Sequence, residues 1–140
     1  MSPSDAISWL HLLGCSCVVL HSNRLTVCRR RGIADLLHLL ENTPGTLRGS
    51  FIADKVIGKG AAALMALGGV AGIYADVISR PALALLEESG IAAEYGTLAD
   101  NIINRSGTGI CPVEALCSSL STPAECLEPI RNFINRQQIP

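Results

Sequence analysis

The 140-residue sequence contains no apolar run near the ~20 residues that a membrane-spanning helix needs. Its N-terminus lacks a basic segment followed by an apolar core and a cleavage site, so we expect a cytoplasmic protein without membrane contact. Only 16% of the residues are charged and the net charge is −1, so bulk charge does not favour nucleic acid or an anionic membrane as partner. A hydrophobic content of 49% predicts a folded chain, with one domain over residues 1–140.

Metal-binding and phosphate-binding motifs are also missing. The six cysteines form no C-x-x-C pair and no histidine lies at ligand spacing, so the sequence predicts no metal and no cofactor. The segment Gly58-Lys59-Gly60 lacks the G-x-x-x-x-G-K-[ST] spacing of a P-loop and its Mg²⁺-binding hydroxyl, which argues against an ATPase. Most of the cysteines are therefore expected to be buried free thiols.

A βαβ unit is predicted over residues 50–79. Short apolar strands at Phe51–Ala53 and Ile73–Ile78 flank a helix at Gly58–Leu67 that is apolar on nearly every side. A helix of this kind is covered by other elements. We expect the rest of the chain to be arranged around this unit.

The remaining elements follow from local signals. A β-hairpin is predicted where residues 15–20 and 24–28 flank the turn Ser22-Asn23, and Ser4 is predicted to cap the first helix. Further helices are predicted at residues 5–13, 33–41, 81–88, from 112 onward and at 122–136, with another strand at 91–95. Strands that alternate with helices indicate parallel pairing and right-handed crossovers.

Three separated motifs carry a family resemblance: ADKVIGKGAAAL, IYADVISRPALALLEESGI and NRSGTGICPVE. In this order they resemble the DUF1893 family, small uncharacterised prokaryotic proteins with a cytidine-deaminase-like fold. The resemblance covers roughly residues 12–116 and leaves the C-terminal helix outside. It implies an α/β fold, a three-layer α/β/α sandwich with a five-stranded mixed sheet.

The sequence departs from the zinc deaminases at both of their motifs. On the order of elements, the His-x-Glu position falls near Arg31-Gly32-Ile33 and the P-C-x-x-C position falls on the bend 54–59. Guanidinium, ammonium and glycine do not bind Zn²⁺ at neutral pH, so deamination by a zinc-bound hydroxide is not expected. Basic residues at two helix starts would favour an anion instead.

The leading hypothesis is therefore metal-independent binding of a small anionic or nucleotide-like ligand. The candidate residues lie in three segments. The bend 54–59 contributes Asp54, Lys55, Gly58 and Lys59, the His-x-Glu position contributes Arg31, and the NRSGTGICP loop contributes Asn104 and Arg105. A purely structural reading remains open, in which Gly58 and Gly60 only permit close packing of helix on sheet. Asn104, Arg105 and Glu114 could likewise form a network that only orders the loop.

Two alternatives belong to other functional classes. Cys111 precedes Pro112 at a predicted helix N-cap, where the dipole favours a thiolate, and it would be the nucleophile of an enzyme whose reaction is unknown. The simpler reading is a structural cap, because no histidine base is near in sequence. A protein-interaction module is the third class. Such a module would be indicated by an exposed apolar stripe of Leu127, Ile130 and Ile134. Core packing is the commoner explanation for a stripe of this kind.

Overall fold

The computed structural model describes residues 1–30 and 33–138. The helices are α1 (Pro3–Leu13), α2 (Ala34–Asn42), α3 (Pro44–Leu47), α4 (Lys59–Gly68), α5 (Arg80–Glu88), α6 (Pro112–Cys117) and α7 (Pro123–Gln138). The strands are β1 (Cys17–His21), β2 (Arg24–Cys28), β3 (Phe51–Ile57), β4 (Gly72–Ser79) and β5 (Ala92–Ala99). Within the described ranges, no helix combines the length and hydropathy needed to cross a membrane.

The five strands form one mixed sheet in the order β2-β1-β3-β4-β5. β1 is antiparallel to both β2 and β3, whereas β3, β4 and β5 are parallel to one another. The α/β class and the five-stranded mixed sheet predicted from the sequence are therefore confirmed. The direction of pairing changes between β1 and β3, and open α/β sheets commonly bind ligands beyond the carboxyl ends of their parallel strands.

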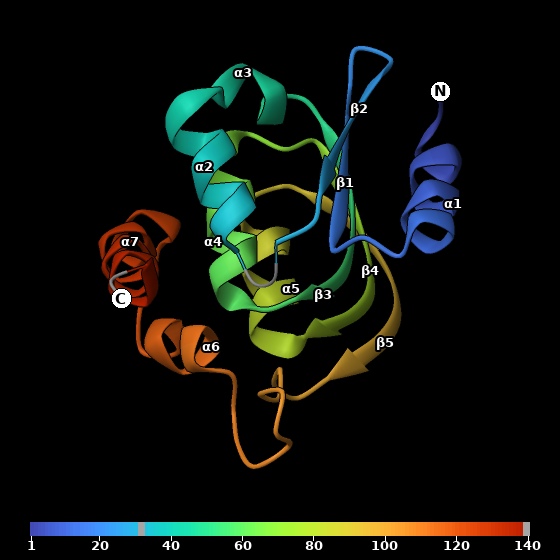
Figure 1. Cartoon of the computed structure of the whole chain (residues 1–140). Helices are drawn as coiled ribbons and strands as arrows, with labels where there is room; N and C mark the ends of the chain where they lie inside the picture. Colours follow the sequence, from blue (N-terminus) through green and yellow to red (C-terminus); the bar gives the residue numbers. More distant parts are fainter. Residues whose placement is uncertain (31–32, 139–140) are drawn as a thin grey trace.

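The two faces of the sheet are covered unequally (Figure 1). Leu10 of α1 packs on Val18 and Ala53 in a small core on one face. The other face carries the main core, where α2, α4, α5 and α7 contribute buried side chains such as Leu64 and Leu86. Figure 1 shows α1 on one side of the strands and this group of helices on the other.

Helix α1 begins earlier than predicted, and its N-cap is Ser2 rather than Ser4. The Ser2 Oγ accepts the Asp5 N–H at 3.4 Å, and the Asp5 carboxylate accepts the Ser2 N–H at 2.8 Å. This reciprocal capping box needs an acidic residue three positions after the cap, which Ser2 has. Pro3 then occupies the first helical turn, where a missing N–H has no consequence.

The hairpin between β1 and β2 confirms the predicted turn. Ser22 and Asn23 have φ angles of 48° and 65°, the left-handed conformation that a two-residue hairpin turn requires. Asn accepts this conformation readily. The register then pairs Cys17 with Cys28, both buried.

Strand β3 runs four residues beyond the predicted Phe51–Ala53, which corrects the position of the bend. Pairing with β4 continues through Val56↔Val77 and Ile57↔Ile78, so Asp54 and Lys55 belong to the strand. Their charge indicated a strand end, but parallel pairing overrides this local preference. β5 is also longer than predicted and ends at Ala99.

The C-terminal helix α7 packs on the main core. Ile130 and Ile134 are buried there and Leu127 is partly buried, so the apolar stripe faces inward and offers no exposed interaction surface. Arg131 binds Glu41 of α2 with Nε and Oε2 2.7 Å apart. A capping box precedes the helix: the Thr122 Oγ1 accepts the Glu125 N–H at 3.3 Å, and the Glu125 Oε1 accepts the Thr122 N–H at 3.1 Å.

Candidate functional site

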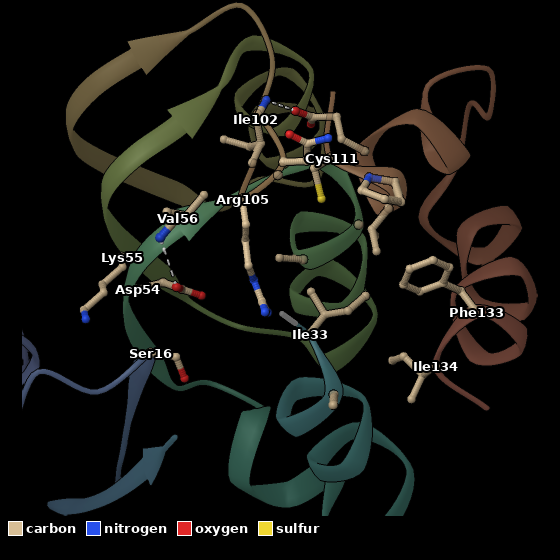
Figure 2. Close-up of a pocket in the computed structure, with 18 of the residues that line it drawn as sticks. Ser16, Ile33, Asp54, Lys55, Val56, Ile102, Arg105, Cys111, Phe133 and Ile134 are labelled. Atoms are coloured by element: carbon tan, nitrogen blue, oxygen red, sulfur yellow. Dashed lines mark hydrogen bonds between the residues drawn. The ribbon is translucent and has the colours of Figure 1, made fainter. Parts of the chain in front are cut away.

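A cavity of about 780 Å³ lies where the strand direction changes, beyond Asp54 of β3. Figure 2 shows its walls, which come from the β3–α4 segment, the loop at residues 101–111, α7 and the start of β1. Ser16, Asp54, Arg105, Cys111 and Phe133 line it. The cavity is large enough for a small organic molecule of nucleotide size.

Asp54 is the buried charged group of this cavity. Its side chain is 8% exposed and the carboxylate points into the cavity in Figure 2. The Oδ1 atom accepts the Val56 N–H at 3.2 Å. Burial raises the pKa of Asp54 to about 7, although the backbone N–H groups of Val56 and Lys55 oppose this shift. Asp54 therefore faces the cavity as a carboxyl group whose ionisation is disfavoured in the free protein.

Arg105 reaches across the same cavity from the 101–111 loop, and its guanidinium points towards Asp54 (Figure 2). Within the described residues its side chain has no hydrogen bond or ion pair. Asn104 orders the loop, because its Oδ1 accepts the Thr108 N–H at 3.0 Å and its N–H donates to the Gly109 carbonyl at 2.8 Å. The predicted residues Asn104 and Arg105 thus differ in role: Asn104 shapes the loop that presents Arg105.

The N-terminus of α4, where the sequence indicated an anion site, is occupied by the protein's own Glu114. This carboxylate is 2% exposed. Its Oε1 accepts the Lys59 N–H at 2.8 Å and the Ser79 hydroxyl at 2.7 Å, and its Oε2 accepts the Ile102 N–H. The negative charge that the helix dipole favours is therefore supplied internally.

The two lysines of the bend are also engaged elsewhere. Lys55 lines the cavity, and its ammonium donates to the Gly14 carbonyl at 3.2 Å. The Lys59 ammonium donates to the Leu120 carbonyl at 2.6 Å, and Lys59 is not part of the cavity wall. Gly58 does line the cavity, and a Cβ there would lie 3.2 Å from Ile102, so close packing explains this glycine.

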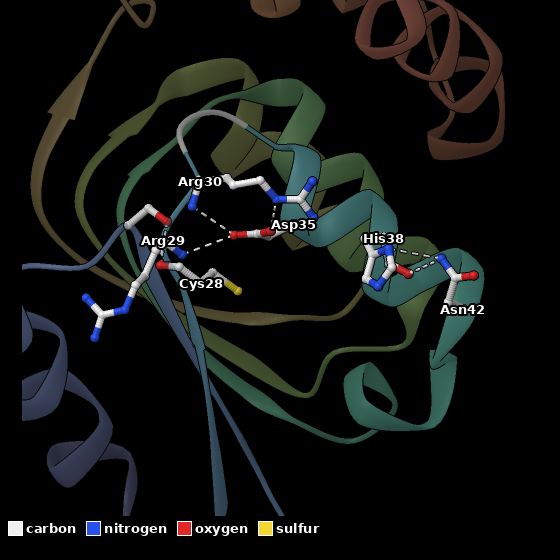
Figure 3. Close-up of polar contacts among 7 residues, drawn as sticks. Cys28, Arg29, Arg30, Asp35, His38 and Asn42 are labelled. Atoms are coloured by element: carbon white, nitrogen blue, oxygen red, sulfur yellow. Dashed lines mark hydrogen bonds and ion pairs between the residues drawn. The ribbon is translucent and has the colours of Figure 1, made fainter. Parts of the chain in front are cut away.

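The arginines after β2 are held by Asp35 (Figure 3). The Asp35 Oδ2 accepts the Arg29 and Arg30 N–H groups at 3.1 and 3.0 Å, and its Oδ1 pairs with the Arg30 guanidinium. Arg30 is consequently committed to the link between β2 and α2. Arg29 lines the edge of the cavity. The predicted ligand residue Arg31 lies outside the described residues.

Cys111 is the N-cap of α6 and its sulfur points into the cavity (Figure 2). It is half-buried, whereas the other five cysteines are buried. Burial raises the pKa of Cys117 to about 12, and the Cys28 thiol together with burial raises that of Cys17. The part of the chain that the structure describes holds no group of three or more His, Cys, Asp or Glu suited to a metal ion.

Sequence reasoning missed the cavity wall formed by α7 and the true contacts of Glu114. Phe133 and Ile134 lie in this wall, although the helix was expected to be an appendage. The spacing of apolar residues along α7 was the sequence signal that could have placed this helix against the core and the cavity. Glu114 lies in the first turn of α6, as its position after Pro112 indicates, and its carboxylate also caps α4 through Lys59, 55 residues away along the chain.

The family model for a domain of unknown function, DUF1893, matches residues 5–134, so the chain belongs to this family. The crystal structure of a DUF1893 family protein from Thermotoga maritima is similar to the chain, with a TM-score of 0.85 and 26% sequence identity. That similarity covers 92% of this chain and 87% of the other. No curated protein matches the chain. The family match includes most of α7, beyond the residues 12–116 on which the sequence resemblance rested.

Replacing Glu114 tests the internal anion. Glu114→Ala leaves three donors without an acceptor and should lower the free energy of unfolding by on the order of 3 to 5 kcal/mol. Glu114→Gln should lose less, because one oxygen remains while the new amide faces the Ile102 N–H. Urea denaturation measures both. The exposed Glu88→Ala is the control, and a Glu114→Ala variant no less stable than this control would contradict the assignment.

Asp54 should make stability depend on pH. Between about pH 4 and about pH 7 the folded chain keeps a proton that the unfolded chain loses, so the free energy of unfolding falls as pH rises. Asp54→Asn lacks this dependence and should exceed wild type by up to roughly 4 kcal/mol above pH 7. Urea denaturation across this pH range tests it, with the exposed Asp100→Asn as control. Parallel curves for wild type and Asp54→Asn would show that Asp54 titrates normally.

Cys111 should react fastest of the six thiols with a small alkylating reagent at neutral pH. The physical reason is access, because the other five are buried and thiolate formation is suppressed at Cys17 and Cys117. Mass spectrometry of peptides after brief labelling gives the order, and Cys111→Ser should remove the fast phase. Faster labelling at Cys117 or Cys126 would mean that α6 and α7 open more readily than this structure implies.

Proposed function

We propose that this DUF1893 protein is a metal-independent binding domain for a small anionic, nucleotide-like ligand. The observation that carries the proposal is the cavity of about 780 Å³ with buried Asp54 on one side and, on the other, the Arg105 guanidinium, which has no partner among the described residues. Arg105 supplies the charge for an anionic group, since planar guanidinium binds phosphate or carboxylate through two hydrogen bonds. Arg29 at the edge of the cavity adds a second cation.

The site that we propose differs from the one expected at the bend. Glu114 occupies the helix terminus, and both lysines donate to carbonyl groups, so the ligand's anion is assigned to Arg105 instead of Lys59. The apolar residues Ile102, Val113 and Phe133 provide the remaining walls, which suits a ligand with a flat, weakly polar part. The order of helices and strands supports a cytidine-deaminase-like three-layer fold as part of the same proposal, without the zinc chemistry.

An enzyme that uses Cys111 as nucleophile is the second candidate. The observation in its favour is that the Cys111 sulfur faces the same cavity as Asp54 and Arg105 (Figure 2). Among the described residues no histidine lines the cavity, so the base of a cysteine–histidine pair is not provided there. Binding is therefore the better-supported function.

Thermal unfolding with phosphate, sulfate and a panel of nucleoside monophosphates tests the proposal. A ligand at 100 times its Kd should stabilise wild type by about 2.7 kcal/mol, which is a clear rise in Tm for a domain of this size. Arg105→Met should melt like wild type without ligand and lose most of the rise. Arg24→Met, the same change at the hairpin, should keep it.

Two results would contradict the proposal. In the first, no member of the panel stabilises wild type. In the second, Arg105→Met and Arg24→Met respond equally, which would place the anion elsewhere on the protein.

A further inference from the structure

We infer that the cavity selects ligands that carry a pair of adjacent N–H donors, accepted by Asp54, together with an anionic group bound by Arg105. A guanine base edge and a guanidino group both present such a pair. This inference rests on the proposed function and adds to it the chemistry by which one ligand class is distinguished from another.

Among the described residues, only backbone N–H groups donate to the Asp54 carboxylate: the Val56 N–H donates to Oδ1, and no side chain donates to either oxygen. The nearest lysine in sequence, Lys55, donates its hydrogen bond to the Gly14 carbonyl. Above its pKa of about 7, Asp54 is an ionised carboxylate that only accepts hydrogen bonds, and a planar pair of N–H groups matches its two oxygens. A ligand with such a pair therefore supplies N–H donors that no side chain among the described residues provides.

The same geometry disfavours ligands that present carbonyl oxygens to Asp54. Hypoxanthine differs from guanine by lacking the 2-amino group, so it offers one N–H where guanine offers two adjacent donors. Uracil flanks its N–H with two carbonyl oxygens that would oppose the carboxylate. Sites built to hydrogen-bond a polar group reject analogues without it, because a buried group is then left unpaired.

The wall opposite the polar groups is suited to a flat ring. Phe133 of α7 and Ile33 extend towards the cavity in Figure 2, and Ile102 lies on the loop side. An aromatic side chain and branched aliphatic side chains pack well on the face of a base. Asp54 and Arg105 both line the cavity of about 780 Å³ and, among the described residues, form no ion pair with each other, so each is available to a ligand.

Titration calorimetry with GMP and IMP tests the inference on the intact chain. Wild type should bind GMP about tenfold or more tightly than IMP, the effect of one lost hydrogen bond to a buried charged group. Asp54→Asn presents an amide that both donates and accepts, so the two affinities should converge. Arg105→Met should weaken both nucleotides and leave their ratio unchanged. Guanidinoacetate forms a further arm, to separate a guanidino acid from a nucleotide as the source of the N–H pair.

The outcomes distinguish this inference from the proposed function. Equal affinities of wild type for GMP and IMP, both lowered in Arg105→Met, would overturn the role of Asp54 and leave anion binding intact. Guanidinoacetate binding that depends on Asp54, without nucleotide binding, would support the N–H pair with a guanidino acid as ligand. Absence of binding in all three arms, together with no stabilisation by the anion panel, would overturn both. The ratio measured on wild type keeps the test decisive even if Asp54→Asn folds poorly.

Discussion

The structure depends on one buried carboxylate, that of Glu114. It accepts hydrogen bonds from the segments that follow the three parallel strands: Lys59 after β3, Ser79 at the end of β4 and Ile102 after β5. A carboxylate removed from water is unfavourable unless donors surround it, and here two backbone N–H groups and a hydroxyl do so. Segments that would otherwise separate at the carboxyl edge of the sheet are thereby joined, and the loop with Arg105 is fixed beside β3.

This arrangement explains why the N-terminus of α4 is not available to an external anion. A free helix N-terminus attracts anions, and a cavity next to one ordinarily binds them there. In this chain Glu114 satisfies that terminus, and Gly60 allows α6 to approach α4, since a Cβ at Gly60 would overlap Val113. Among the described residues, Asp54, Arg105 and Arg29 are charged side chains of the cavity wall that no other side chain binds. In the proposed site, side chains on β3 and the loop would therefore position the ligand instead of the helix dipole.

The features predicted correctly from the sequence are those with a local cause. Ser22 and Asn23 identify the hairpin, Pro112 the start of α6, and the alternation of strand and helix the parallel part of the sheet. The errors arise where contacts between residues far apart in the sequence determine the local structure. β3 includes Asp54 because β4 pairs beyond it, and Lys59 turns to Leu120, a contact that no local pattern contains. Asp54 and Arg105 were named as site residues, but their separation from Lys55 and Lys59 required the three-dimensional structure.

The sequence separations around Glu114 bear on the order of folding. Its partners Lys59, Ser79 and Ile102 lie 55, 35 and 12 residues away along the chain. Closing such loops requires chain entropy to be lost before the contacts form, so folding slows as separations grow. The carboxylate gains its donors only when all three parallel strands are in place. The edge of the sheet that carries the cavity therefore gains this stabilisation only after the three strands have come together.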